Sequence, residues 1–433
     1  MRFFILSIFL ALASCTIVAQ NTTTSFNVGG LKVILKPTVK DVISVRMFYR
    51  GGVSNYTPEQ TGIEDMALVA AVECGTKKYN KNTFKDLQDA YGIDIGGSSG
   101  RDFGNISMTC ISKYFNEGWD LFSEAIVNPI FDARELDLLR AKMISDLQQQ
   151  EGDPENYLEQ MALKHAFKDT PYATQPAGTE TTLSKFTTAD VKNYYAGILN
   201  KNQMFLVVVG KISKDELTKK INSTLASIPV KPYSPKNIEL TSFKGSSLVT
   251  EQREVATNYI TGILNAPIMS SEDYVPYRLA VSVLSSNLFR EIRTKRNLSY
   301  APDAHIVNGR ISYTSVNVST TDPKASVEVI VNELKDIQDG TISEVGLEEL
   351  KGSFITNNYM REQSSAAMAV TLGQAEVMGD WKLADELVNK VKAATVEKIR
   401  DVAMKYISGV KWTYLGDVKA ATAASSAFSL SVD

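Results

Sequence analysis

Two residues suited to bind a peptide backbone or an oxyanion lie close together in the chain. Arg293 and Tyr300 are seven positions apart in the segment 288–300, which reads LFREIRTKRNLSY. A guanidinium fork and a phenolic hydroxyl can both donate hydrogen bonds to a carbonyl oxygen or an oxyanion. Residue types alone favour a plainer interpretation, because a run of basic residues is usually a solvated face, here beside a core tyrosine.

A second group of chemical interest is acidic. Glu64 and Asp65 precede an apolar run at 66–72, and Asp146 lies in a separate predicted helix. A hard cation needs six or more oxygen ligands, and the first helix offers only two adjacent carboxylates before its apolar run. We therefore expect Glu64 and Asp65 to occupy the first turn, where the helix dipole favours anions, and residues 66–72 to be buried.

Histidine and cysteine chemistry is restricted by number. The only histidines are His165 and His305, 140 positions apart, so no histidine cluster exists and both are expected to be structural. The cysteines are Cys15, Cys74 and Cys110. A Cys74–Cys110 disulfide fits an oxidising compartment, but two separately buried thiols are the favoured interpretation.

The composition is that of a soluble globular protein. The chain has 433 residues, which predicts two or three domains, and 44% are hydrophobic and 22% charged. These values exclude a disordered chain, a fibrous repeat and a multi-span membrane protein. With 46 basic and 49 acidic residues, the net charge is −3, so the concentrated positive charge typical of nucleic-acid-binding proteins is missing.

Residues 1–20 have the pattern of an export signal. Arg2 precedes an apolar run at 3–13 that is too short to span a bilayer. The sequence Leu-Ala-Ser-Cys ending at Cys15 resembles a bacterial lipobox, in which the cysteine is lipidated. Alternatively, cleavage after Ala19 releases a soluble chain. Either way we expect an exported protein, in the bacterial periplasm or anchored to the outer membrane through lipid.

Hydrophobic periodicity divides the mature chain into two halves, 21–232 and 233–433, joined near a segment containing Pro229, Pro232 and Pro235. In the first half, strands are predicted at 31–35, 42–49, 106–111 and 204–209, and helices at 61–74, 83–91, 116–127, 134–151, 157–167, 188–198 and 215–226. In the second, strands are predicted at 256–264, 311–320 and 411–415, and helices at 273–285, 288–293, 325–339, 344–358, 365–378 and 396–407. The tail at 420–433, rich in alanine and serine, is expected to fray. The pattern predicts an α+β fold with helices packed on one face of each sheet.

A string of short motifs resembles the insulinase/pitrilysin-type zinc metallopeptidases along essentially the whole mature chain. In the first half the motifs are Gly51-Gly52-Val53-Ser54-Asn55-Tyr56, Gly62-Ile63-Glu64-Asp65-Met66, Gly75-Thr76, Pro171-Tyr172, Gly178-Thr179 and the segment 202–210. In the second they are the segments 288–293 and 297–300. The resemblance implies two homologous domains, each a mostly antiparallel sheet with helices on one face.

The zinc motif of that family is missing. Active members carry H-x-x-E-H, in which two histidines one helical turn apart bind zinc and the glutamate activates water. The matching positions here are Asp65, Leu68 and Val69, and the more distant glutamate that completes the metal site is replaced by Asp146. A zinc site with a carboxylate base cannot be assembled from these residues, so no metal or cofactor is expected in this chain.

The second-half motif is retained, which reverses the preference for a plain cation cluster. Arg293 and Tyr300 match an Arg/Tyr pair that, in active members, orients the substrate backbone and stabilises the tetrahedral intermediate. Asn297 stands where the family usually has glycine, and asparagine tolerates the left-handed conformation better than most residues.

The resemblance therefore implies a non-catalytic subunit. In two-chain members one subunit brings the zinc helix and the other brings the Arg/Tyr pair. We expect this chain to complete an exported heterodimeric peptidase that cleaves short unfolded peptides, with zinc in an H-x-x-E-H paralogue and no peptidase activity of its own. The alternative is an inactive peptide-binding or scaffolding protein, for example an anchored homodimer. No nucleic acid is expected, and membrane contact only through a lipid anchor.

Overall fold

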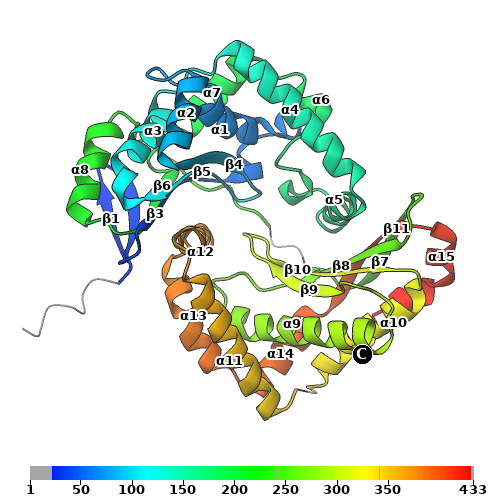
Figure 1. Cartoon of the computed structure of the whole chain (residues 1–433). Coiled ribbons are helices and arrows are strands. Elements are labelled where there is room, and N and C mark those ends of the chain that lie inside the picture. The colour runs from blue at the N-terminus through cyan, green and yellow to red at the C-terminus, as the bar shows by residue number, and fades with distance from the viewer. Residues whose placement is uncertain (1–21, 240–241, 341, 431–433) are drawn as a thin grey trace, which may run out of the picture.

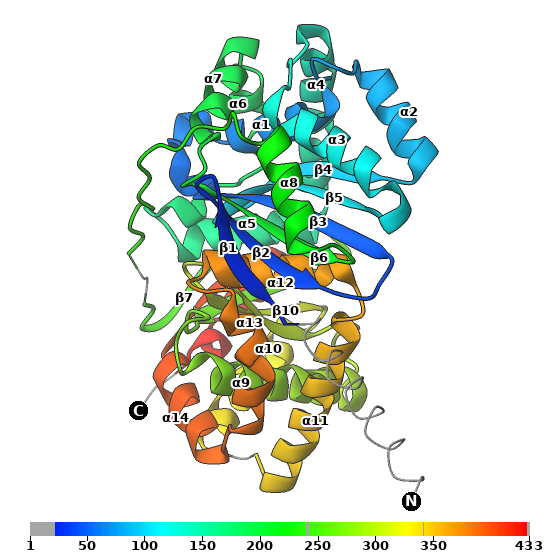
Figure 2. The same cartoon turned by 90° about the vertical axis from the view of Figure 1, so that its left-hand side faces the viewer.

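The computed structural model describes residues 22–239, 242–340 and 342–430. The predicted export signal, with its lipidation candidate Cys15, lies outside these residues. The described chain forms two halves, each with one sheet and an outer layer of helices, and the two sheets face each other across a middle layer (Figures 1 and 2). In the described residues, no helix is both long and apolar enough to cross a membrane.

The N-terminal half contains a six-stranded sheet in the order β1-β2-β6-β3-β5-β4. Its strands are β1 (Thr24–Val28), β2 (Leu31–Pro37), β3 (Val42–Arg50), β4 (Asp94–Ser99), β5 (Phe103–Ile111) and β6 (Met204–Gly210). Its helices are α1 (Ile63–Glu73), α2 (Lys81–Tyr91), α3 (Phe115–Val127), α4 (Ala133–Gly152), α5 (Pro154–Ala166), α6 (Glu180–Leu183), α7 (Thr188–Ile198) and α8 (Lys214–Thr224).

The C-terminal half contains a five-stranded sheet in the order β7-β11-β8-β10-β9. Its strands are β7 (Gly245–Gln252), β8 (Asn258–Asn265), β9 (Asp303–Val307), β10 (Tyr313–Thr320) and β11 (Gly409–Gly416). Its helices are α9 (Tyr274–Leu288), α10 (Pro323–Gln338), α11 (Glu344–Arg361), α12 (Ser365–Val377), α13 (Lys382–Lys392), α14 (Val396–Tyr406) and α15 (Val418–Ala423), and a π-helical segment η5 (Phe289–Lys295) continues α9.

The two sheets have the same topology apart from the additional strand β1. In both, one parallel pair (β2 with β6, β7 with β11) is followed by three antiparallel pairings that end at an edge strand, β4 or β9. The elements of one half therefore have counterparts in the other: β4 corresponds to β9, α1 to α9, α4 to α11 and α5 to α12. The prediction of an α+β fold with two similar domains is confirmed.

The sheets are buried on both faces, which the strand sequences explain. Successive strand residues point to opposite faces. In β3, Met47 and Tyr49 belong to the large core under the outer helices, whereas Phe48 faces the other way and packs with α12. Every residue of β6 is buried, as expected for a continuous apolar run covered on both sides.

The middle layer comes from an exchange of helices between the halves. Helix α12 of the C-terminal half packs on β3 and β6, and α5 of the N-terminal half packs on β8 and β11 (Figure 1). Gly373 of α12 lies directly on the Phe48 ring, because a Cβ there would be 2.0 Å from the ring. The buried Glu376 of α12 accepts hydrogen bonds from Lys32 at 2.7 Å and Arg50 at 2.5 Å. The predicted one-sided packing is thus completed on the other face by a helix from the opposite half.

The C-terminal tail and the edge strand β4 are among the features that differ from the sequence-based expectations. The tail was expected to fray, but it forms α15 and a short 3₁₀ turn, and Phe428 and Leu430 are buried in the C-terminal core. The Phe428 ring contacts Trp412, with centroids 5.5 Å apart. The edge strand β4, with the sequence DIGGSS, was not predicted, because glycine and serine have low strand propensity and its pairing with β5 is a tertiary effect.

Candidate functional site

The degenerate metal position lies at the start of α1. Gly62 enters the helix with a φ of +92°, and Glu64 in the first turn is fully buried. One Glu64 oxygen accepts hydrogen bonds from Tyr194 Oη at 2.6 Å and from Asn55 Nδ2 at 2.8 Å. The other accepts from Ser99 Oγ at 2.9 Å. Glu64 is therefore a buried acceptor with three protein donors, not the exposed first-turn anion that the helix dipole alone would place there.

Burial shifts the proton affinity of both acidic residues of α1. Desolvation raises the pKa of Glu64 to about 7, although its three hydrogen bonds oppose the rise. Desolvation also raises the pKa of Asp65 to about 6, opposed by the hydrogen bond that its Oδ1 accepts from the Ser99 backbone N–H at 2.7 Å. The backbone and the hydroxyl of one residue on β4 thus hold both carboxyl groups.

The other degenerate positions are not assembled into a ligand set. Leu68 is fully buried and packs directly on β5, since a Cβ on Gly104 would lie 2.3 Å from Leu68 Cδ1. Val69 is half-buried. Asp146 on α4 is exposed, and no hydrogen bond or ion pair joins it to Asp65 in the described part of the chain. No cluster of three or more histidine, cysteine or acidic residues that could hold a metal occurs among the described residues.

The cation cluster near the second motif is organised by one carboxylate. Glu291 accepts from Arg290 at 3.0 Å, from Lys295 at 2.8 Å and from Arg296 at 2.6 Å. Hydrogen bonds from these three cations lower the pKa of Glu291 to about 2. The π-helical geometry of η5 belongs to a type of segment often found at functional sites. Three of the four basic residues therefore have an acidic partner.

Arg293 is the exception. Its guanidinium carbon lies 4.1 Å from the centroid of the Tyr300 ring and 4.8 Å from that of Phe289. No ion pair to Arg293 occurs within residues 22–239, 242–340 and 342–430. Tyr300 is 78% exposed. Asn297, between the two in sequence, has a φ of +52°, the left-handed conformation that asparagine tolerates better than most residues.

The histidines and cysteines have structural surroundings. His165 on α5 lies against the C-terminal sheet, with Nε2 3.1 Å from Ser247 Oγ, and burial lowers its pKa. His305 on β9 has a partner that sequence analysis overlooked two positions earlier: its Nδ1 is 2.6 Å from Asp303, which raises the pKa of the imidazole. Cys74 and Cys110 are free and buried.

Both halves of the chain match models of one protein family. Residues 33–180 match the family described as Insulinase (Peptidase family M16), and residues 185–354 match the Peptidase M16 inactive domain. The chain belongs to the insulinase (M16) family. Because its helix α1 carries no histidine, the chain is an inactive homologue within that family.

One curated relative is similar to this chain in sequence, and two solved structures share its fold. The Helicobacter pylori protein named non-peptidase homolog YmxG is 23% identical over 373 residues, covering 82% of this chain and 84% of that protein. The crystal structure of an M16 inactive domain from Pseudomonas fluorescens has a TM-score of 0.83 at 16% identity, covering 91% of this chain and 98% of the other. The periplasmic protease PqqL from Escherichia coli has a TM-score of 0.74 at 15% identity, and the match covers 94% of this chain but 48% of PqqL.

Several residues of this M16 chain escaped the sequence analysis. Nothing in the sequence marked Tyr194 as a functional residue, but its hydroxyl donates a hydrogen bond to Glu64. Asn55 was seen only as part of a motif, and Ser99 lies on the strand that was not predicted. No local sequence pattern marks these three residues, because their hydrogen bonds with Glu64 span 9, 35 and 130 positions of sequence.

Proposed function

We propose that this chain is the non-catalytic subunit of an exported, two-chain zinc peptidase of the M16 family that acts on short unfolded peptides. In this proposal Arg293 and Tyr300 bind the peptide backbone or the oxyanion, and a partner subunit with the H-x-x-E-H motif supplies the zinc. The zinc is therefore a cofactor of the partner. Residues 1–20 supply the export signal, with lipid attachment at Cys15 or release into the periplasm.

The observation that carries the proposal is the state of Arg293. A cation near an acidic residue normally pairs with it, and the three cations around Arg293 each form an ion pair with Glu291. Arg293 instead is held by two aromatic rings, which leave its N–H groups available to an acceptor from outside. Tyr300 beside it is mostly exposed, so a second chain or a peptide can reach both groups.

The size of PqqL supports a two-chain assembly. That protease is about twice as long as this chain, which aligns with 48% of it. A pair of chains of this size therefore corresponds in length to one such protease, with the two subunits providing different parts of one chamber.

The test begins with the tagged chain purified from its own cells. The proposal predicts a stoichiometric partner with the H-x-x-E-H motif and a peptide-cleaving activity that a zinc chelator abolishes. In the purified complex, Arg293→Ala should lower kcat/KM by about 100-fold, as expected for loss of one donor to a developing oxyanion. Arg290→Ala is the matched control, because Arg290 is a neighbouring exposed cation already paired with Glu291. Full activity of the Arg293→Ala complex would refute the proposal.

A peptide-binding or scaffolding role is the second candidate, favoured by the filled metal position at Leu68 and by the exposure of Tyr300. It predicts that the chain is recovered without a zinc-bearing partner, alone or as a homodimer, and that its preparations cleave no peptide.

A further inference from the structure

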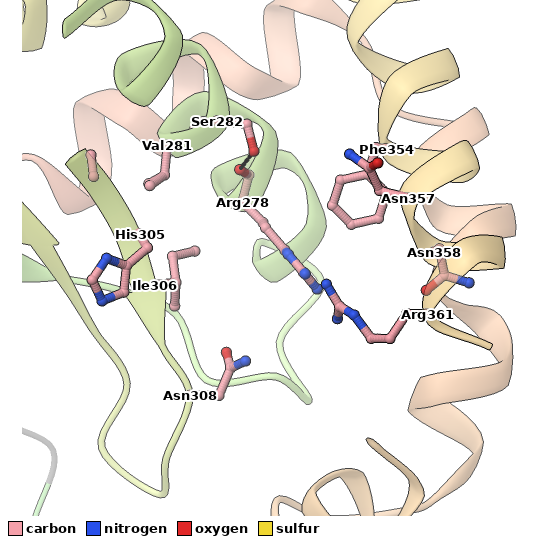
Figure 3. Close-up of a pocket in the computed structure, with 11 residues that line it drawn as sticks. Arg278, Val281, Ser282, His305, Ile306, Asn308, Phe354, Asn357, Asn358 and Arg361 are labelled. Atoms are coloured by element: carbon pink, nitrogen blue, oxygen red, sulfur yellow. Dashed lines mark hydrogen bonds between the residues drawn. The ribbon is translucent and has the colours of Figure 1, made fainter. Parts of the chain in front are cut away.

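A cavity of about 270 Å³ lies in the C-terminal half, between α9, α11 and the edge strand β9 (Figure 3). It is separate from the Arg293–Tyr300 pair, neither member of which lines it. Two arginines from different helices, Arg278 of α9 and Arg361 of α11, extend toward each other in this space (Figure 3).

The cavity carries positive charge with no acidic residue in its lining. The Arg278 guanidinium is fixed over the Phe354 ring, 4.7 Å from its centroid. Neither arginine forms an ion pair within the described ranges, and two cations that share a cavity repel each other. Asp303, the first residue of β9, does not line the cavity and is bound by His305. The arrangement favours an anion from outside the chain.

A further donor faces the same space. Asn308, which lines the cavity, accepts a hydrogen bond on Oδ1 from the Tyr274 hydroxyl at 2.8 Å. This bond fixes the amide so that its NH₂ group is left as the donor. Two guanidinium forks and one amide N–H group form a donor set that suits a carboxylate.

The third wall of the cavity is a strand edge. Among the strands of the described residues, β9 is the last in its sheet and pairs only with β10, so no described strand pairs with the backbone groups on its other side. Three consecutive residues of β9, Ala304, His305 and Ile306, line the cavity. An extended peptide can add to such an edge through main-chain hydrogen bonds.

The same three elements surround the degenerate metal position in the N-terminal half. There the counterparts of α9, α11 and β9 are α1, α4 and β4. Helix α1 lies directly on β4, since a Cβ on Gly97 would be 2.1 Å from the carbonyl oxygen of Leu68. In the C-terminal half the corresponding place is a cavity with two arginines.

We propose that this cavity binds the C-terminal carboxylate of an extended peptide whose backbone adds to the edge of β9. Arg278 and Arg361 hold the carboxylate, and the Asn308 amide donates to it. The volume is near the lower end of the roughly 300–1,000 Å³ found for small-ligand sites, so it accommodates the last residue or two of the peptide.

The test is a binding measurement on the purified mature chain, which needs neither zinc nor a partner. The probes are two fluorescein-labelled peptides of alternating valine and serine, one with a free carboxylate and one with a terminal amide. We expect the free acid to bind about 10- to 100-fold more tightly, as a charge-assisted pair of hydrogen bonds implies. Arg278→Gln and Arg361→Gln should each remove that preference, whereas Arg400→Gln, an exposed arginine near Asp401, should keep it.

Three outcomes would overturn the proposal: equal binding of the two peptides, binding of neither, or a preference that survives both arginine substitutions. Inorganic phosphate is the competing probe. If phosphate binds and requires both arginines while the peptides show no preference, the cavity is a simple oxyanion site. Arg361 is exposed, so its substitution leaves the core intact. If the Arg278→Gln variant fails to fold, the Arg361→Gln variant alone still tests the proposal.

Discussion

The Arg293 guanidinium lies over the Tyr300 ring at 4.1 Å, and this contact fixes two groups that are seven positions apart into one donor surface. The ring of Phe289 supports the same guanidinium from one turn earlier. Aromatic contacts orient an arginine without using its N–H groups, whereas the carboxylate of Glu291 occupies those of its neighbours. The structure thus separates Arg293 from the cation cluster in which it lies.

Removal of the Tyr300 hydroxyl should lower the activity of the proposed complex without lowering the stability of this chain. Because the side chain is 78% exposed, we expect Tyr300→Phe to change the free energy of unfolding by less than about 0.5 kcal/mol in urea titrations. The ring contact with Arg293 persists in this variant. In the proposed complex, kcat/KM should nevertheless fall, and a variant as active as wild type would show that the hydroxyl has no part in catalysis.

The buried Glu64 predicts a dependence of stability on pH. Its pKa rises from 4.5 to about 7 on folding, so the folded state binds the proton more tightly than the unfolded chain. The stabilisation is complete below pH 4.5 and is lost as pH rises to about 7, by roughly 3 kcal/mol. Asp65 acts in the same direction up to about pH 6.

Urea unfolding between pH 4 and 8 measures this effect. Glu64→Gln should remove most of the decrease between pH 5 and 7 and leave the smaller contribution of Asp65. As a control, Glu59→Gln changes an exposed carboxyl group nearby and should leave the decrease between pH 5 and 7 as in wild type, because the hydrogen bond with Thr57 lowers the pKa of Glu59 and confines its effect to more acidic pH. A Glu64→Gln profile as steep as that of wild type would contradict the assignment.

Glu376 is predicted to hold α12 on the N-terminal sheet. Its carboxylate is 3% exposed and binds Lys32 and Arg50, whose side chains remain 42% and 22% exposed. Glu376→Ala should lower the free energy of unfolding by about 1–3 kcal/mol, less than for a fully buried pair because both cations can regain water. Amide hydrogen exchange should increase first in α12. Glu386→Ala, which removes an exposed pair with Lys390, should have little effect.

Leu68 tests whether the former metal position is now part of the core. Leu68→Ala leaves a cavity against Gly104 and should cost about 2–5 kcal/mol in urea unfolding, as for other buried leucines. Val69→Ala, one position along, removes a half-buried side chain and should cost less than half of that. Equal effects of the two substitutions would mean that Leu68 has no special packing role.

Much of the architecture could be predicted from local pattern. The helix 188–198 has the predicted bounds in the structure, and the strand 204–209 is extended only by Gly210. Such elements have strong hydrophobic periodicity and clear capping residues, for example Thr187 with Asp190. Strands β1, β4 and β7 were missed because an edge strand rich in glycine, serine and other polar residues has little local signal.

Part of the candidate site could also be predicted from the sequence. The loss of zinc ligands is a matter of residue types, so the sequence alone establishes that α1 carries no histidine. The identity of Arg293 as the cation outside the Glu291 cluster could not be predicted, because all four basic residues lie within one turn or two of the same carboxylate. The π-helical geometry of η5 and the left-handed turn at Asn297 determine which of these cations pairs with Glu291 and which one contacts Tyr300.

The sequence by itself therefore determined the fold class, the two similar halves and the absence of a histidine zinc site, because these depend on periodicity and residue type within short windows. The tertiary structure alone decided the exchange of α5 and α12, the burial of Glu64 under Tyr194, and the meeting of Arg278 with Arg361. Each of these contacts joins segments far apart in the chain. Long-range contacts depend on how whole surfaces pack, and a local sequence pattern does not predict that packing.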